Sequence, residues 1–473
     1  MSVRIKSAVK VVINLISFIV LLFCLNTHPT GYEFIFLLPL SFLLCFNFLL
    51  FPTWKRTGSI TIVCIIVTAF IRYVLLACSY SLDPCYNIND FYCKDSTSLS
   101  AAILYMCYEL LFIACFCFLF FKKRNGYLLC RNQQFIYGLT NNSYCYFYVI
   151  FCIAMVLSHP VVFNNIHFLR LATDTGDRVA AQELDTTELI VRQFFQVGLL
   201  LMFTILVGHW AEKYQITYKK KYFIASLILA LLIVSVIVGE QRAVQIYTAF
   251  TAIYFLCRIF PNKKKVVVSS ITITVLVVVG LLSIYKTFYA FNSDSYREAL
   301  SSGISSGFSL SYQFEAYVLG PVSVAASLQL PSTFTPDIWR LLFDFVRSTI
   351  GPSFFVKDLG IDTTTVIYNR FVSHGFYSNG FLLPISAQGA IYLTPVLGPL
   401  LICLYYRCSF SLERVMKRTS NPYVCVFLGY MFIRFSTCMI STNINTINTM
   451  ASLTILFIFP LLLVNKVLLR NNN

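Results

Sequence analysis

The sequence has few charged residues for its length. Asp, Glu, Lys and Arg make up 12% of the 473 residues, and hydrophobic residues make up 58%, whereas soluble domains average about 25% and about 45–50%. The mean hydropathy is accordingly high, at +0.74. This composition excludes a soluble globular protein and predicts a membrane protein.

The sequence also lacks the short motifs that many enzymes use to bind nucleotides or metals. It contains no P-loop, no Gly-rich dinucleotide fingerprint and no Ser-centred nucleophile elbow. Although the chain has 17 Cys, no Cys-x-x-Cys pair or Cys/His cluster has metal-ligand spacing. Paired Gly/Pro-interrupted spans in two matching halves, typical of repeat-built transporters, are absent as well. We therefore expect no metal, no other cofactor and no nucleotide-driven machinery.

The cysteines lie mostly inside apolar runs, where a free cysteine behaves as a small hydrophobic residue. Cys85 and Cys93 differ, because they stand in a polar segment, 81–100, that we place outside the membrane. A disulfide between these two residues and a pair of free thiols both remain open.

Apolar runs of the length that crosses a bilayer, about 20 residues, recur along the chain. Basic residues precede the first run, but no small-residue cleavage site follows it, so we interpret the run as an uncleaved span rather than a signal peptide. About twelve spans are predicted, at 11–25, 34–51, 59–79, 101–121, 143–163, 191–208, 222–239, 243–260, 266–288, 381–405, 422–440 and 450–468.

The connections between these spans alternate in charge, which predicts their orientation. The formal net charge of +16 would suggest a polyanion partner in a soluble protein. Here about 23 of the 36 Lys and Arg residues fall in one set of connections, with two acids, Glu212 and Glu413. Such basic connections belong in the cytoplasm. Both termini are then cytoplasmic, most of the charge reflects topology, and no nucleic-acid partner is expected.

The expected fold is an all-α polytopic membrane protein in three parts. Residues 1–288 hold spans one to nine, residues 289–380 form a large outer loop, and residues 381–473 hold spans ten to twelve. The loop contains Gly/Ser turns, an apolar stretch too short to span at 318–330, and helical spacing of apolar residues at 338–345. This pattern is typical of a folded segment rather than a linker.

Basic side chains on the outer side are the candidates for binding an anionic substrate. Arg242 belongs to Gly239-Glu240-Gln241-Arg242, which is wedged between two apolar runs, and an ionisable residue so close to hydrocarbon is a functional hypothesis by default. Arg340, Arg347 and Arg370 gather late in the large loop. Several arginines aimed at one pocket would hold a pyrophosphate without a metal. Ordinary roles, at a tight turn or a solvated surface, stay open.

A general base must be a carboxylate or a histidine on the same side. Glu315 lies in an aromatic, partly apolar setting, although a structural salt bridge is an equal interpretation. His374 follows Arg370 by four residues, one helical turn, just before the tenth span. Glu240, Asp344 and His167 are further candidates, and the sequence does not choose among them.

The assembled pattern resembles the bacterial O-antigen polymerases, the Wzy-type oligosaccharide repeat unit polymerases. The resemblance rests on about twelve spans, one dominant outer loop between late spans, the arginine at a tight outer turn, and the Gly-rich segment 377–401. The spacing of Arg340 and Gly351 matches a pattern of that family, an arginine and a glycine with ten residues between them. The segment 164–190 lacks the matching pair.

This resemblance implies a GT-C-like, metal-independent and inverting glycosyltransferase of the bacterial inner membrane. It would join undecaprenyl-pyrophosphate-linked oligosaccharide repeat units on the periplasmic face. Arg242, Arg340, Arg347 and Arg370 would then bind the pyrophosphate, and Glu315 or His374 would act in catalysis. The lipid bilayer and a chain-length regulator protein are the further partners that the resemblance implies.

Two other functions remain open from the sequence. An O-antigen ligase would share the topology and the arginine and histidine residues on the outer side. A lipid-linked oligosaccharide flippase or other transporter also has about twelve spans, but it should carry charges through its spans and have short loops. Here the predicted spans are nearly free of charged residues apart from Arg72, Glu109 and Arg434. This sparse charge and the long outer loop favour an enzyme over a transporter.

Overall fold

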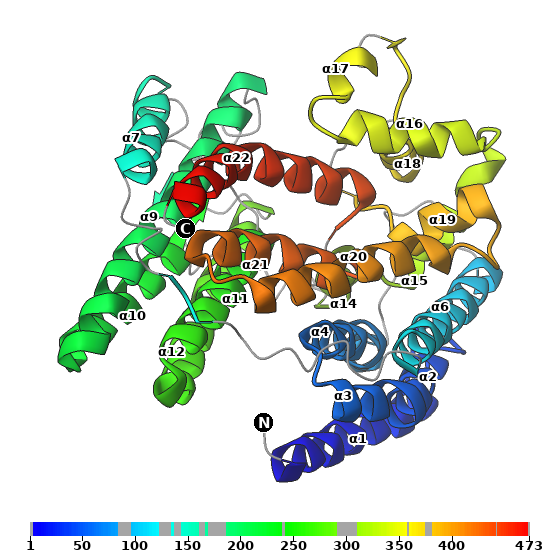
Figure 1. The fold of residues 1–473 in the computed structure, drawn as a ribbon. Helices are drawn as coiled ribbons and strands as arrows, with labels where there is room; N and C mark the ends of the chain where they lie inside the picture. The colour runs from blue at the N-terminus through cyan, green and yellow to red at the C-terminus, as the bar shows by residue number, and fades with distance from the viewer. Residues whose placement is uncertain are drawn as a thin grey trace. The chain divides into compact units, whose positions relative to one another are not determined.

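The computed structural model is built almost entirely of helices (Figure 1). By packing, the chain forms two compact units: Met1–Cys130, Ser309–Arg414 and Arg434–Ser452 make the first, and Arg131–Phe308, Val415–Ile433 and Leu453–Asn473 make the second. The expected boundaries after residues 288 and 380 separate membrane spans from an outer loop, which packing does not test, so they stay a prediction. The structure describes residues 3–83, 96–122, 134–136, 143–159, 166–168, 186–238, 242–290, 310–356, 359–373, 381–440 and 442–471.

The first unit begins with four membrane-length helices or helical rods. Each of the two middle rods contains a π-helical turn, a feature frequent at functional sites, and the second of these turns carries Arg72. The elements are α1 (Val3–Asn26), then α2 (Leu37–Cys45), η1 (Phe46–Leu50) and α3 (Phe51–Thr57), then α4 (Ile60–Ala69), η2 (Phe70–Leu75) and α5 (Leu76–Leu82), and α6 (Ser96–Lys122).

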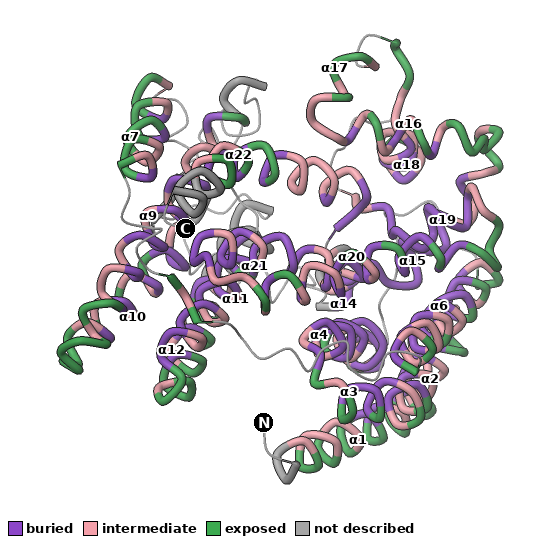
Figure 2. The backbone as a smooth tube through the Cα atoms, viewed as in Figure 1, coloured by how far each residue is buried: buried purple, intermediate pink, exposed green. Residues whose placement is uncertain are grey.

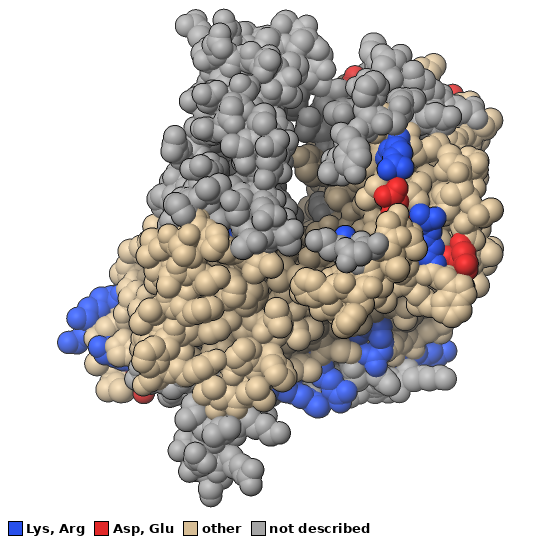
Figure 3. Space-filling view, turned by 90° about the horizontal axis from the view of Figure 1, so that it is seen from above, with Lys and Arg blue, Asp and Glu red and all other residues tan. Residues whose placement is uncertain are grey.

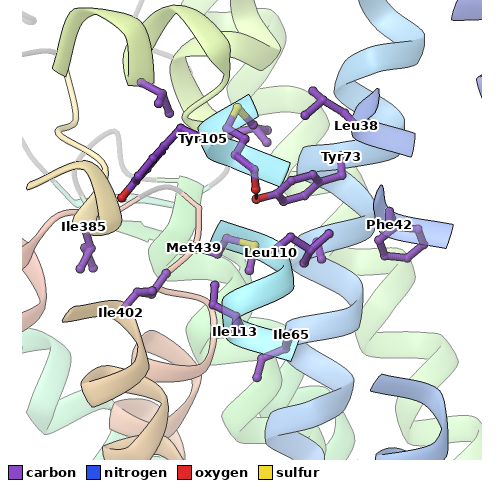
Figure 4. Packing of buried hydrophobic residues seen from close by; sticks show 14 of the residues in the cluster. Leu38, Phe42, Ile65, Tyr73, Tyr105, Leu110, Ile113, Ile385, Ile402 and Met439 are labelled. Atoms are coloured by element: carbon purple, nitrogen blue, oxygen red, sulfur yellow. Dashed lines mark hydrogen bonds between the residues drawn. The ribbon is translucent and has the colours of Figure 1, made fainter. Parts of the chain in front are cut away.

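The later part of the first unit consists of shorter helices that pack against these rods. The elements are α14 (Leu310–Val318), α15 (Pro321–Gln329), η6 (Leu330–Ser332), α16 (Ile338–Ser348), α17 (Ser353–Val356), α18 (Thr364–Val372), α19 (Ile385–Leu393) and α20 (Pro399–Arg418). The apolar stretch 318–330 forms α15, which is buried against α6 and α19. Among the described residues of the loop that we expected to be folded, α14 and α15 therefore pack directly on membrane-length helices. Figure 4 shows part of the shared core, with Leu38, Tyr73, Leu110, Ile385 and Met439 in one cluster.

The second unit is also helical, with one small antiparallel sheet in which Ile166 lies opposite Val238. Its C-terminal part comprises the end of α20 and parts of α21 (Pro422–Ser436) and α22 (Ile444–Asn471). The remaining elements are α7 (Ser143–Leu157), β1 (Ile166–Phe168), α9 (Thr186–Thr217), α10 (Lys220–Ser235), β2 (Val236–Val238), α11 (Arg242–Ile259), η5 (Pro261–Lys263) and α12 (Lys264–Ala290).

Six helices among the described residues are long and apolar enough to cross a membrane: Lys6–Asn26, Leu37–Thr57, Ile60–Leu82, Ser96–Lys122, Ile190–Thr217 and Ile444–Val464. They coincide with the predicted spans one to four, six and twelve. Large apolar side chains are exposed along them, among them Val11, Leu15 and Phe18 of α1, and much of α1 is coloured as exposed in Figure 2. In Figure 3 most of the described surface is tan, with Lys and Arg in separate blue groups. The chain is a polytopic membrane protein. The count of twelve spans stays a prediction.

The predicted tenth span, 381–405, differs from the structure, because it is broken into α19 and α20. Thr394 has a φ of 79° at the break. A Cβ atom at Gly389 would lie 2.2 Å from the carbonyl oxygen of Gly398, so only glycine allows the two helices to approach so closely. Tyr108 of α6 donates a hydrogen bond to the carbonyl of Val396 (2.6 Å), a backbone group that the break frees. Tyr105 of α6 donates to the carbonyl of Ser386 in α19 (2.7 Å).

Candidate functional site

The candidate site of the first unit is built on α16 and α18. Asp337 begins α16 by accepting a hydrogen bond from the backbone N–H of Trp339 (3.1 Å). The other end of α16 is attached to α22, since the Thr449 hydroxyl donates to the carbonyl of Ser348 (2.8 Å). Both ends of the helix that carries Arg340, Asp344 and Arg347 are therefore fixed.

Arg340 and Arg370, thirty positions apart in the sequence, meet at Asp362. The Nη2 atom of Arg340 donates to the backbone carbonyl of Asp362 at 2.9 Å. The Nη2 atom of Arg370 lies 3.1 Å from the Asp362 carboxylate, and the side chains of this pair are 52% and 44% exposed. The fold thus brings two of the predicted arginines to one exposed acidic residue.

Arg340 keeps part of its hydrogen-bonding capacity unused. Its guanidinium stacks over the ring of Phe334, 5.2 Å from the ring centre, and its buried Nε atom has no hydrogen-bond partner among the described residues. Arginine N–H groups in a fixed fork are suited to a phosphate oxygen. Arg340 is thus held in place, with its Nε–H unpaired but shielded from solvent.

Asp344 lies one turn after Arg340 on the same helix, and its side chain is fully buried. Its carboxylate accepts hydrogen bonds from the backbone N–H of Thr364 (3.0 Å), from the hydroxyl of Thr364, and from Nε2 of Gln388 (2.8 Å). Thr364 is the first residue of α18, where a negative charge is favourable. Burial raises the pKa of Asp344, against the opposing effect of these hydrogen bonds and of Arg340. Asp344 therefore positions α18 and Arg370 relative to α16.

Glu315, predicted as a catalytic residue, lies in α14 with no exposed surface. Its carboxylate accepts hydrogen bonds from the Tyr80 hydroxyl of α5 and from the backbone N–H of Ser323 in α15 (3.0 Å). Burial raises the pKa of Glu315, although these hydrogen bonds act in the other direction. In this arrangement Glu315 joins three helices, while its catalytic role stays a prediction.

The remaining predicted residues are not all brought together. Arg347 lies seven residues after Arg340 on α16 and is half-buried. Arg242 is the first residue of α11, in the second unit, and its side chain is not described. His374, Glu240 and the Cys85–Cys93 segment lie outside the described residues, and of His167 only the position in β1 is described.

The structure also pairs the charges that the sequence shows inside the spans. The Nη1 atom of Arg72 lies 2.9 Å from Oε1 of Glu109, and the two side chains are 1% and 0% exposed. The Nε atom of Arg72 donates to the carbonyl of Leu319 (3.0 Å), just before the turn into α15. The pair therefore ties the α14–α15 connection to the spans.

Sequence analysis missed one residue of the site, Asp362. This residue stands just before α18 in a connection without periodic spacing, so no pattern singles it out. Among the described residues, no group of three or more His, Cys, Asp or Glu could hold a metal ion.

Comparisons with models of protein families, with curated proteins and with solved structures find no match to this chain.

Proposed function

We propose that this chain is an O-antigen polymerase, a membrane glycosyltransferase with about twelve spans in a GT-C-like arrangement. It joins undecaprenyl-pyrophosphate-linked oligosaccharide repeat units on the periplasmic face of the bacterial inner membrane, with both termini in the cytoplasm. The observation that carries this proposal is the meeting of Arg340 and Arg370 at Asp362, in a helical segment packed on the ends of membrane spans.

The reaction needs positive charge where the lipid pyrophosphate leaves. An acceptor hydroxyl oxygen attacks the anomeric carbon of the donor sugar, and the bond from that carbon to the pyrophosphate oxygen breaks with both electrons going to the leaving group. Arg340 and Arg370 stabilise this developing charge, the contribution that is usually largest in such catalysis. Direct attack inverts the anomeric centre. Arg347 and Arg242 stay proposed as further pyrophosphate contacts.

A carboxylate or histidine must take the proton of the acceptor hydroxyl. Asp362 is exposed and lies beside both arginines, so a pyrophosphate that replaces it on Arg370 frees its carboxylate to accept that proton. His374 follows α18 by two residues and keeps its predicted role. Glu315 is less suited in the described arrangement, since its carboxylate is buried and accepts hydrogen bonds from neighbouring helices.

The test compares three variants in cells whose own copy of the gene is deleted. We expect Arg340→Gln and Arg370→Gln to lose polymer, with a rate reduction of about 10²–10³-fold for each lost charge, while protein levels in the membrane stay unchanged. Arg56→Gln is the matched control, because Arg56 is an exposed arginine in α3 outside the site. The measurement is the ladder of lipopolysaccharide lengths on gels.

The same gels separate a polymerase from the two alternatives. A polymerase defect leaves lipopolysaccharide capped with one repeat unit, whereas a ligase defect removes all O-antigen from it. A flippase defect also removes all O-antigen, because the repeat unit stays on its lipid at the cytoplasmic face. Normal ladders in both arginine variants would contradict the site assignment.

A further inference from the structure

The helix α16 exposes an apolar face although it is not one of the membrane-length helices. Its buried side, with Leu341, Asp344 and Ser348, packs inward. Exposed apolar side chains occur on α16, where Trp339 is 70% exposed, and again on α17, where Phe355 is 88% exposed. Parts of both helices are coloured as exposed in Figure 2. The set comprises Ile338, Trp339, Leu342, Val346, Phe354, Phe355, Leu359 and Ile361. An exposed apolar helix face of this kind indicates a contact with a membrane or another protein.

Hydrogen bonds attach this segment to α6 and α22, and both attachment points lie near the beginnings of these helices. Just before it, the Nε2 atom of Gln329 donates to the Ser98 hydroxyl (2.6 Å), in the first turn of α6. Just after the end of α16, the backbone N–H of Ile350 donates to the Ser452 hydroxyl of α22 (3.0 Å). Ser452 is eight residues from the start of α22, about 12 Å along the helix.

Both spans are polar at these points. The first five residues of α6 read Ser-Thr-Ser-Leu-Ser, and α22 contains Asn445, Asn448 and Ser452 before its long apolar run. Polar residues at the beginning of a span lie in the headgroup region, which borders a hydrocarbon core about 30 Å thick. The segment from η6 to α16 is therefore held between two points at the membrane interface, and α17 follows the second point after two residues.

The charges of α16 fit the same position. Arg340 and Arg347 are seven residues apart, two helical turns, and so lie along one edge of the helix; both are half-buried. Arginines at the border of an apolar helical face are typical of helices that lie in the plane of a bilayer surface, with the charged groups at phospholipid headgroups and the apolar face sunk about 5–10 Å.

We infer that α16 and α17 form an interfacial element, whose exposed apolar face lies in the acyl-chain boundary of the bilayer that the same chain spans. Trp339, Leu342 and Phe355 are inserted among lipid chains, and Arg340 and Arg347 lie at the depth of the headgroups. This inference does not depend on the proposed reaction. Phospholipid, rather than a second protein, covers this apolar face, because the segment is fixed at the polar beginnings of two spans.

The test uses the fluorescence of Trp339 in the full chain reconstituted into phospholipid vesicles. The chain has three Trp, so Trp54→Phe with Trp210→Phe leaves Trp339 alone. We expect it to lose most of its emission when the phospholipid is brominated near the headgroup end of its acyl chains. Bromination near the methyl ends should quench less, and acrylamide in the water should quench little.

Three quenching patterns would contradict the interfacial position of Trp339. Quenching by acrylamide but not by brominated lipid would show that the face lies in water, and quenching by neither would show that protein covers it. Stronger quenching by deeply brominated lipid would place the helix inside the hydrocarbon. Each of these outcomes overturns the inference.

Two controls accompany the test. Trp210→Phe with Trp339→Phe leaves the buried Trp54, which neither the lipid nor acrylamide should quench strongly. If the variant that keeps only Trp339 fails to fold, the difference between the wild-type chain and Trp339→Phe supplies the same signal.

Discussion

Removing one member of the buried Arg72–Glu109 pair should damage the protein more than removing both. The two side chains are almost fully buried, with Nη1 and Oε1 at 2.9 Å. Arg72 also donates from Nε to the carbonyl of Leu319. In Glu109→Met the guanidinium stays charged with no carboxylate beside it, while in Arg72→Met the carboxylate is left unpaired.

The magnitudes follow from this geometry. Breaking a buried ion pair from one side costs about 3–5 kcal/mol, because it leaves an uncompensated charge. The double variant, Arg72→Met with Glu109→Met, leaves no buried charge at these two positions. It loses the hydrogen bond to Leu319, whose unsatisfied carbonyl costs about 1–3 kcal/mol. We therefore expect the double variant to be more stable than Glu109→Met alone.

Thermal unfolding in detergent ranks the stability of four proteins: the wild type, Arg72→Met, Glu109→Met and the double variant. Asn14 and Asn47 serve as the matched control, because they exchange two hydrogen bonds without charge, at 3.0 and 2.9 Å. Their alanine variants should give smaller losses and less departure from additivity. If the losses of Arg72→Met and Glu109→Met simply add in the double variant, the two residues do not act as an ion pair and the reasoning is refuted.

Two of the other buried carboxylates, Glu413 and Glu315, are tested by substitution. Glu413 accepts hydrogen bonds from Ile60 N (2.8 Å) and Thr61 N (3.1 Å) at the beginning of α4, so Glu413→Ala should lower stability by about 2 kcal/mol, the upper range for a lost helix cap. Glu33→Ala, which removes an exposed carboxylate, should change stability by less than about 0.5 kcal/mol, and equal melting temperatures for the two variants would contradict the capping role. Glu315 has a raised pKa, so its protonated form is favoured in the folded chain and its contribution to stability is lost as pH rises through the folded pKa. The melting temperature of Glu315→Gln should therefore match the wild type below the ordinary pKa of Glu and exceed it increasingly at higher pH, and a pH-independent difference would disprove this.

The helical membrane class was predictable, because long apolar runs determine it without tertiary information. The broken tenth span was missed, since average hydropathy across 381–405 does not register the Thr394-Pro395 and Gly398-Pro399 steps. These residues limit helix continuation locally, and the close contact of Gly389 with Gly398 fixes the break.

The site was predictable only in part. Arginine chemistry singled out Arg340 and Arg370, but their meeting at Asp362 depends on how α16 packs against α18 and α19. Arg72 and Glu109 were noticed as charges within spans, yet their pairing depends on the register of two rods and on the π-helical turn of η2. Sequence reasoning identifies such groups more readily than it identifies their partners.

The proposed function is tested most directly by the purified chain in phospholipid vesicles, supplied with undecaprenyl-pyrophosphate-linked repeat units. The measurement is mass spectrometry of the lipid-extracted products over time. We predict lipid-linked oligosaccharides of two and more units, with one undecaprenyl pyrophosphate released for each bond formed, and loss of both products in Arg370→Gln but not in Arg56→Gln. Repeat units that stay single with the wild-type chain, or that polymerise equally with Arg370→Gln, would contradict the assignment.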